Sequence, residues 1–265
     1  MMEENTNPLV SVIMPAYNAG RFLESAIRSV MAQTYPHWEL LVLDDGSQDD
    51  TVAIAQRLAA EDHRIRVLPN GQNLGVARTR NRGFALCKGA YAALLDSDDL
   101  WRAEKLERQL ALAEQTGADI IYCSYELIDE QGRKKCEDFL VPESTDFDAM
   151  LIRTVISCST ALLSRQIVDR YRFATDVYHE DLALWLQLLR DGFAARGATE
   201  VLASYRVMTG TRASNKLKSA LNRWRVFRRY LHLPLSKSAV ALVRYGFLGL
   251  QKYKNKKPDS QGEET

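Results

Sequence analysis

The sequence lacks the features of a disulfide-stapled, secreted or membrane-spanning protein. Its four cysteines lie far apart and show no metal-ligand spacing, so we expect reduced thiols in the cytoplasm. The polar, acidic N-terminal segment MMEENTNP predicts no signal peptide. The longest apolar run, near residues 239–250, is interrupted by Arg244 and is too short to span a bilayer. The composition therefore favours a cytoplasmic globular protein.

Acidic residues are missing from one long segment near the C-terminus. No Asp or Glu occurs between Glu200 and Asp259, whereas that stretch holds 14 Lys and Arg. Residues 1–200 instead carry 31 Asp and Glu against 21 Lys and Arg. An acidic body with a basic C-terminal segment predicts an anionic surface as the partner of that segment.

Gly-x-Gly-x-x-Gly and Walker-type phosphate loops are also absent, although the first 125 residues have the pattern of an α/β protein. Short apolar runs predict strands at Leu9–Met14, Glu39–Leu43, Ile65–Leu68, Ala90–Leu95 and Asp119–Cys123. Helical patterns lie between them, at residues 18–31, Thr51–Ala60, Val76–Cys87 and Lys105–Gln115. Strands that alternate with helices through short links predict a doubly wound, mostly parallel central sheet.

The pattern changes after residue 125. We expect a hairpin or loop at Ile128–Leu140, strands at Thr160–Leu163 and Val201–Val207, and an apolar helix at Glu180–Arg190. Two basic amphipathic helices, separated by Pro234, follow from Ser214. The expected organisation is a disordered N-terminus (1–7), a main domain (8–213), a basic helical extension (214–254) and a disordered tail (255–265).

Polar clusters stand where the predicted parallel strands end. Tyr17-Asn18 follows the first strand, Asp44-Asp45 the second, and Asp96-Ser97-Asp98-Asp99 the fourth. Ligands of doubly wound sheets bind at this carboxyl edge. Each cluster also has a structural interpretation. Asn18 can cap a helix, Ser47 or Asp49 can cap the helix after Asp44-Asp45, and Asp98 or Asp99 can cap the helix at Lys105.

The functional interpretation of these carboxylates is a nucleotide and a cation. Three carboxylates within Asp96–Asp99 repel one another unless a cation or donors compensate them, and Mg²⁺ or Mn²⁺ prefers carboxylate and phosphate oxygens. A carboxylate of Asp44-Asp45 can accept from a nucleobase imide or a ribose hydroxyl.

Three further segments carry candidate residues, each with a plainer alternative. Asn73 and Arg78 at a helix start can meet a phosphate or a nucleoside, or can be a capped helix with a surface arginine. Glu180-Asp181 can supply a general base or stabilise the helix dipole. Arg206 and Arg212 can close over a pyrophosphate or lie in an exposed loop.

Taken in order, these segments resemble family 2 glycosyltransferases of the GT-A fold. The matching stretches are Val10–Asn18, Asp44–Ser47 with Asp50-Thr51, Asn73–Gly75 with Ala77-Arg78 and Asn81, Asp96–Asp99, and Glu180-Asp181 before Leu184-Trp185. Residues 205–208 and 214–218 look like a bacterial subgroup that builds lipopolysaccharide, teichuronic acid or other surface polysaccharides.

The resemblance implies an inverting enzyme that moves a sugar from a nucleotide sugar, with UDP favoured, to a glycan or glycolipid acceptor. It implies that Pro15, Tyr17 and Asp44 line the base pocket, that Asp45 supports it, and that Asp96 contacts ribose or sugar hydroxyls. It implies that Asp98 holds Mn²⁺ or Mg²⁺ and that Asp181 is the catalytic base with Glu180 beside it. The rival classes are a nucleotidyltransferase and a catalytically degenerate, membrane-associated binding protein.

The basic C-terminal segment has three interpretations. Residues 216–257 carry 12 Lys and Arg interleaved with aromatic residues, a combination that suits an anionic membrane surface. The same helices can instead pack their apolar face on the main domain, and nucleic-acid binding ranks last. The expected location is peripheral, on the inner face of the plasma membrane.

Overall fold

The computed structural model describes residues 7–208 and 216–254. The first part runs β1 (Val10–Ala16), α1 (Leu23–Met31), β2 (Trp38–Asp44), α2 (Thr51–Glu61), β3 (Ile65–Val67), α3 (Val76–Leu86) and β4 (Tyr91–Leu94). The middle part runs β5 (Leu100–Trp101), α4 (Lys105–Thr116), β6 (Ile120–Ile128), β7 (Ser144–Thr145), α5 (Phe147–Ile152), β8 (Leu162–Ser164), α6 (Arg165–Arg170), α7 (Glu180–Arg190) and β9 (Ala195–Arg206). The C-terminal part comprises α8 (Lys216–Arg225), a π-helical turn (Val226–Tyr230) and α9 (Leu235–Lys254).

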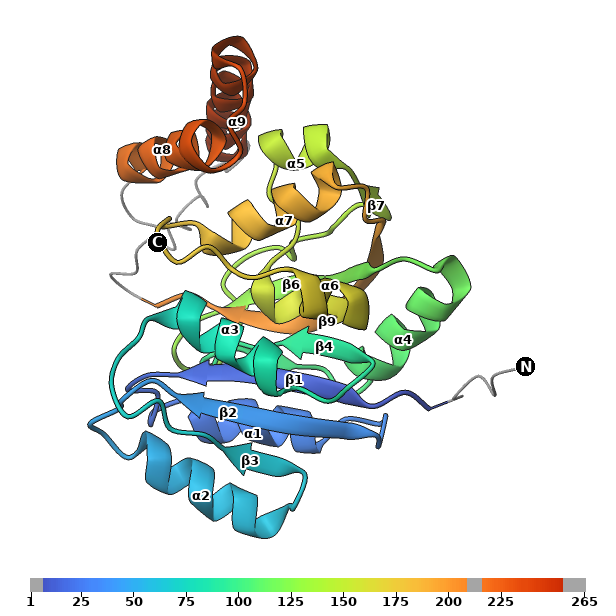
Figure 1. The fold of residues 1–265 in the computed structure, drawn as a ribbon, viewed down its shortest axis with the longest axis vertical. Helices are drawn as coiled ribbons and strands as arrows, with labels where there is room; N and C mark the ends of the chain where they lie inside the picture. Colours follow the sequence, from blue (N-terminus) through green and yellow to red (C-terminus); the bar gives the residue numbers. More distant parts are fainter. Residues whose placement is uncertain (1–6, 209–215, 255–265) are drawn as a thin grey trace, which may run out of the picture.

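The described strands form one nine-stranded sheet. Along its main path the order is β3-β2-β1-β4-β8-β6-β9-β5, and β7 pairs with β9. The pairs β3–β2, β2–β1 and β1–β4 are parallel, as predicted, and so is β6–β9. Figure 1 shows that β1 and β2 point their carboxyl ends toward the left-hand side of the molecule. The predicted α/β class is confirmed.

Two apolar layers cover the sheet because successive side chains of a strand point to opposite faces. Val12 and Met14 of β1 pack in one cluster with the inner faces of α1 and α2, and Ile13 packs in the other with α3 and α7. Every residue of β1 and β2 is buried, which explains why their sequences read as continuous apolar runs. Figure 1 shows α3 and α6 in front of the sheet and α1 behind it.

The strand order differs from the one that a simple alternation of strands and helices predicts. The segment predicted as the fifth strand, now β6, does not lie beside β4. Instead β8 runs antiparallel between β4 and β6. Thr160, which was predicted to begin this strand, instead ends a 3-10 turn (Cys158–Thr160), and β8 begins at Leu162. The short elements β5, β7, α5 and α6 were not predicted, because two to six residues carry too little periodicity.

The basic helical extension packs on the main domain. Val226, Phe227, Leu231, Leu233 and Ala241 are buried in the same cluster that holds α7. The apolar packing predicted for the extension is therefore present. Other apolar side chains of α8 and α9 remain exposed: Leu221, Leu235, Val240, Val243 and Phe247. The predicted disordered ends and Arg212 lie outside the described residues, apart from Asn7.

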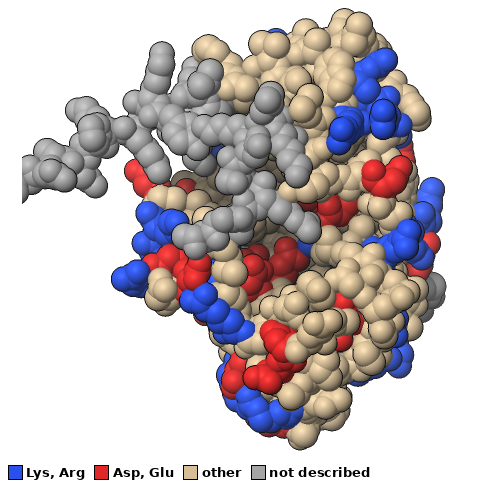
Figure 2. Space-filling view, turned by 90° about the vertical axis from the view of Figure 1, so that its left-hand side faces the viewer, with Lys and Arg blue, Asp and Glu red and all other residues tan. Residues whose placement is uncertain are grey.

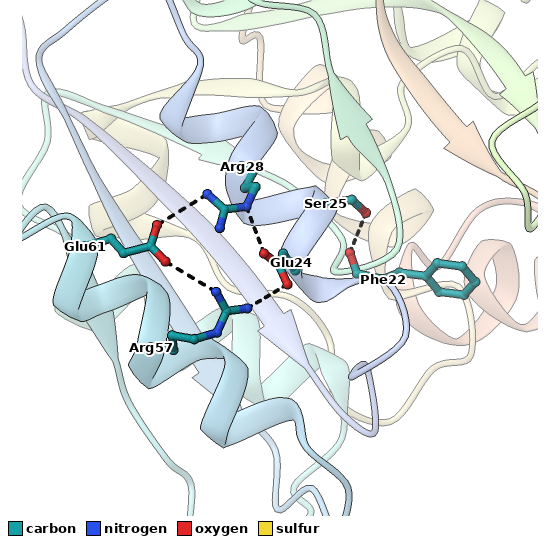
Figure 3. Close-up of polar contacts among 6 residues, drawn as sticks. All are labelled: Phe22, Glu24, Ser25, Arg28, Arg57 and Glu61. Atoms are coloured by element: carbon teal, nitrogen blue, oxygen red, sulfur yellow. Dashed lines mark hydrogen bonds and ion pairs between the residues drawn. The ribbon is translucent and has the colours of Figure 1, made fainter.

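Four charged side chains tie α1 to α2 on the surface (Figure 3). Arg28 and Arg57 each contact both Glu24 and Glu61, at distances of 2.6–3.3 Å between nitrogen and oxygen atoms. Their hydrogen bonds lower the pKa of Glu24. Because these side chains are 40–49% exposed, water and salt screen the network strongly.

We expect Glu24→Gln to lower the melting temperature at pH 7 by about 1–3 °C. A lowered carboxylate pKa stabilises the fold above the unfolded-state pKa, and this gain is lost as the pH falls through the folded-state pKa. The difference from wild type should therefore vanish near pH 3 and shrink in high salt. Glu114→Gln on α4 is the matched control, because Glu114 has no ion-pair partner within the described residues. An equal loss in both variants would contradict the network's contribution.

Candidate active site

Acidic side chains gather at the carboxyl edge of the parallel strands. This edge lies on the left-hand side of the molecule in Figure 1, and that side faces the viewer in Figure 2. Figure 2 shows Asp and Glu side chains collected in a hollow at the middle of this face. The predicted site and the observed concentration of negative charge therefore fall on the same side of the sheet.

The loops after β1 and β2 are tied to each other through Asn18. Its backbone N–H donates to Ser47 Oγ (2.9 Å), and its side-chain Oδ1 accepts from the Gln48 N–H (2.9 Å). Asn18 adopts a positive φ of 47°, and α1 begins five residues later, at Leu23. The prediction that Asn18 caps this helix is therefore wrong, because its side chain accepts a hydrogen bond from the loop after β2 instead.

Asp44 and Asp45 are both buried but have different partners. Within the described residues, the Asp44 carboxylate accepts only from the N–H groups of its own turn, Gly46 and Ser47, both at 3.2 Å. Asp45 accepts from four donors at 2.7–2.9 Å: Asn70 Nδ2, Thr79 Oγ1 and the N–H groups of Leu74 and Gly75. Asp45 therefore anchors the 70–75 loop and the start of α3, and Asp44 keeps more capacity to accept from a ligand.

The other candidate nucleotide contacts surround these two carboxylates. Pro15 is a buried residue of β1 opposite Leu43, one residue before the strand ends. Tyr17 is 50% exposed immediately after that strand. Asn73 lies exposed on the loop that Asp45 anchors, and Arg78 lies exposed in the first turn of α3. Arg78 has no ion-pair partner in the part of the chain that the structure describes.

Arg80 joins two acidic segments that lie 84 residues apart in the sequence. Its guanidinium donates to Asp96 Oδ1 (2.6 Å) and to Glu180 Oε1 (3.0 Å), while its side chain is only 5% exposed. Sequence reasoning missed this residue. The sequence does contain a signal for it. Arg80 lies on the same face of α3 as the apolar residues Ala77 and Phe84, and a charged residue on a buried face implies an ion pair.

Asp98 and Asp99 have contrasting surroundings. Asp99 is buried and accepts from Ser159 Oγ (2.5 Å) and from the Arg206 N–H (2.8 Å). Burial and the charge of Asp96 raise the pKa of Asp98 to about 6. Neither residue caps α4, whose N-cap is Glu104, so that alternative is excluded. Asp98 is thus a half-buried carboxylate beside another negative charge, an arrangement that a cation would relieve.

Arg206 lies inside the protein. Its guanidinium donates to the backbone oxygens of Asp98 (2.8 Å) and Asp129 (2.9 Å), stacks over the ring of Phe22, and leaves the residue 6% exposed. These contacts indicate that Arg206 positions the Asp98 loop. Arg212 lies outside the described residues.

Asp181 lines a pocket of about 230 Å³ with Thr154, Ser157, Tyr125 and Tyr205. Partial burial and the charges of Asp99, Asp96 and Asp98 raise the pKa of Tyr205, which shows that this pocket lies within electrostatic reach of the Asp96–Asp99 segment. Glu180 begins α7 as predicted, and burial raises its pKa even though Arg80 opposes the shift. The segments that carry Asp181 and Asp98 therefore lie near each other.

The chemistry of this donor set fits a divalent cation bound together with a phosphate ligand. Among residues 7–208 and 216–254, no group of three or more His, Cys, Asp or Glu side chains is arranged to hold a metal ion. One or two carboxylates suffice, however, when substrate phosphates complete the coordination, as is usual for Mg²⁺. Asp98, with Asp96 beside it, supplies such a pair.

Solved structures identify the fold. A Staphylococcus aureus TarS fragment in complex with UDP-GlcNAc matches with a TM-score of 0.72 over 89% of this chain and 71% of its own, at 19% identity. The mannosyltransferase PcManGT from Pyrobaculum calidifontis, in complex with GDP-Man and Mn²⁺, matches with a TM-score of 0.67 over 96% and 77%, at 16% identity. The fold is that of the GT-A class of glycosyltransferases.

Sequence comparison identifies the family. The model of glycosyl transferase family 2 matches residues 11–172, and the chain belongs to this family. A Bacillus subtilis protein whose name assigns it to teichuronic acid biosynthesis, TuaG, is 37% identical over 91% of this chain and 96% of its own. The Escherichia coli UDP-Glc:alpha-D-GlcNAc-diphosphoundecaprenol beta-1,3-glucosyltransferase WfgD is 35% identical over 94% and 98%.

We expect Asp98→Asn to stabilise the metal-free protein at pH 8 by about 1–3 kcal/mol. A carboxylate whose pKa is raised on folding destabilises the fold once it ionises, so the gain should disappear below the unfolded-state pKa near pH 4. Urea unfolding with a chelator present at pH 4, 6 and 8 measures this. A gain of the same size at pH 4, or a loss at pH 8, would rule out electrostatic strain at Asp98.

Proposed function

We propose that this protein transfers a sugar from a nucleotide sugar, with UDP as the favoured nucleotide, to a hydroxyl of a lipid-linked or polysaccharide acceptor with inversion. One observation supports this most strongly. The guanidinium of Arg80 holds Asp96, at the donor edge of the sheet, against Glu180, beside Asp181. This pair of contacts supports a site in which a donor-binding group and a proton acceptor lie close together, as a direct displacement requires.

The nucleotide occupies the carboxyl edge of β1 and β2 in this proposal. Tyr17 supplies an exposed ring for the base, and Asp44 supplies a carboxylate whose partners in the described part of the chain are two N–H groups of its own turn. Pro15 shapes the end of β1, and Asp45 holds the loop that carries Asn73. Arg78 is the exposed cation at the start of α3 that can reach the phosphates. The UDP-sugar named for WfgD supports this choice of donor.

Asp98 would hold Mn²⁺ or Mg²⁺ on the diphosphate, with Asp96 beside it. The ion would neutralise the charge that develops on the departing nucleoside diphosphate. Arg206 holds the Asp98 backbone in place through its bond to the Asp98 carbonyl, so its contribution is positional. The Mn²⁺ in the PcManGT complex supports this cofactor class.

Asp181 acts as the general base. As the acceptor oxygen bonds to the anomeric carbon, its proton passes to the Asp181 carboxylate, and the bond from that carbon to the phosphate oxygen breaks. Glu180 is already committed to Arg80, which leaves the pocket-lining Asp181 to take the proton. Fixing the base at the first turn of a buried helix limits its movement, and such orientation contributes several kcal/mol to catalysis.

Asp181→Asn should lower the rate of sugar transfer by about 100-fold or more, because the amide cannot accept the proton. UDP binding should stay unchanged, since the base does not contact the nucleotide. Transfer from each nucleotide sugar in the presence of Mn²⁺, together with calorimetric titration of UDP, tests both statements. Asp169→Asn on α6 removes a carboxylate outside the site and serves as the control. Wild-type turnover in Asp181→Asn would exclude this residue as the base.

We further propose that α8 and α9 attach the enzyme to an anionic membrane surface on its cytoplasmic side. No described helix is long and apolar enough to cross a bilayer. On α9, however, Val240, Val243 and Phe247 lie close together on the helix surface and are 53–72% exposed. Exposed apolar side chains on a helix with only basic charge suit the interface of a membrane with anionic lipids.

Val243→Asp and Phe247→Asp should each weaken binding to vesicles that contain phosphatidylglycerol. The introduced carboxylate opposes both insertion of the apolar face and attraction to anionic lipid. Co-sedimentation at low and high salt measures the effect. Leu140→Asp, which changes a residue that is 60% exposed outside the extension, is the control. Equal binding by all three variants would contradict the proposed attachment face.

A further inference from the structure

A second pocket lies between the C-terminal extension and the segment that precedes the proposed base. It has a volume of about 480 Å³, and its walls come from residues 175–178 on one side and from α8 and the π-helical turn on the other. The side chains from the extension are Asn222, Arg225, Arg229 and Tyr230. Nothing in the proposed donor site or proton transfer uses them.

The amide of Asn222 is the polar group of this pocket that the protein satisfies least well. Asn222 is 4% exposed, and its Oδ1 accepts from Arg225 Nη1 (3.2 Å), which orients the amide. Its Nδ2 is buried with no hydrogen-bond partner within the described residues. A buried donor left unpaired costs free energy, so an acceptor that reached this amide would gain a hydrogen bond that the protein does not supply.

The charge of the pocket favours an anion. Arg225 and Arg229 are both exposed at its wall, and neither pairs with a carboxylate in the described part of the chain. Asp176 also lines the pocket and helps to raise the pKa of Tyr230, so the pocket contains two guanidinium groups and one carboxylate. Paired guanidinium groups with an amide donor suit a phosphate, and the carboxylate suits the hydroxyls of a sugar attached to it.

The pocket lies on the acceptor side of the proposed reaction. Asp176 precedes Asp181 by five residues, so their Cα atoms are at most about 17 Å apart. The extension also reaches the pocket of Asp181 directly, since Arg223 donates to Thr154 Oγ1 (3.0 Å) and Thr154 lines that pocket. Ser219 of α8 also contacts His179, with Oγ and Nε2 3.4 Å apart. In the sequence, His179 lies between Tyr178 of the second pocket and Asp181 of the first.

We propose that this second pocket binds the phosphate that links the acceptor sugar to its lipid, through Arg225, Arg229 and Asn222. The inference rests on the proposed function, because it assigns the acceptor's phosphate to a place near the proposed base. The donor's diphosphate has its own site at Asp98, so the two phosphate groups occupy different parts of the protein. WfgD, whose name specifies a diphosphoundecaprenol acceptor, supports this acceptor chemistry.

The test uses the full chain with UDP and Mn²⁺ at saturation, so that the donor site is filled. The probes are inorganic pyrophosphate and N-acetylglucosaminyl diphosphate with a short alkyl chain. Arg225→Gln and Arg229→Gln should each weaken binding of both probes by about tenfold or more, because each removes a charged hydrogen-bond donor. Asn222→Asp should weaken it further by placing a carboxylate against the phosphate. Arg244→Gln on α9 makes the same charge change outside the pocket and should bind like wild type.

The outcomes separate this inference from the proposed function. Unchanged probe binding in Arg225→Gln and Arg229→Gln, with sugar transfer intact, overturns the pocket alone. Failure to bind UDP, together with arginine-dependent binding of the probes when UDP is omitted, overturns the donor assignment and leaves the pocket standing. If the two variants lose affinity only for phosphatidylglycerol vesicles and not for the soluble probes, the pocket binds a lipid headgroup and the acceptor assignment is overturned. UDP affinity reports correct folding in every variant, Asn222→Asp included.

Discussion

The buried guanidinium of Arg80 is the constraint on which the site depends. A charge in this position needs its carboxylate partners, because without them it would be an uncompensated ion in the interior. Its two partners follow β4 and begin α7, so one side chain of α3 sets the separation of two acidic segments. Asp45 acts similarly beside Arg80, where it binds Thr79 in the first half of α3 and the loop that precedes the helix. Asp96 and Glu180 can thus lie close together because the positive charge of Arg80 compensates their repulsion.

The sequence predicts what local periodicity and strand order determine. The continuous apolar runs of β1 and β2 and the polar residues after them place Asp44 and the Asp96–Asp99 segment on one edge, because parallel strands end on the same side. The helix Glu180–Arg190 is predicted to the residue, since its buried face and its acidic first turn are both local signals. The family resemblance added the assignment of roles, and the family itself is confirmed by comparison.

Long-range pairing accounts for what the sequence does not predict. Nothing local in Leu162–Ser164 indicates that β8 enters between β4 and β6, and the partners of Arg80 and Arg206 depend on that assembled sheet. Asn18 was misassigned because an Asn before a helix can equally bind a neighbouring loop. In the extension, some apolar residues are buried against the main domain, such as Phe227, and others are exposed. The sequence does not predict which residues fall in each group, because that depends on how the extension packs.

The neighbouring residues Asp44 and Asp45 show how strand length itself can be under selection. They are the same amino acid, yet among the residues that the structure describes Asp45 accepts from four donors, whereas Asp44 accepts only from its own turn. Consecutive residues at a strand end face opposite ways, so losing or gaining one residue within β2 would exchange the two carboxylates. Insertions and deletions in β2 should therefore be far rarer among relatives than conservative exchanges of its apolar residues.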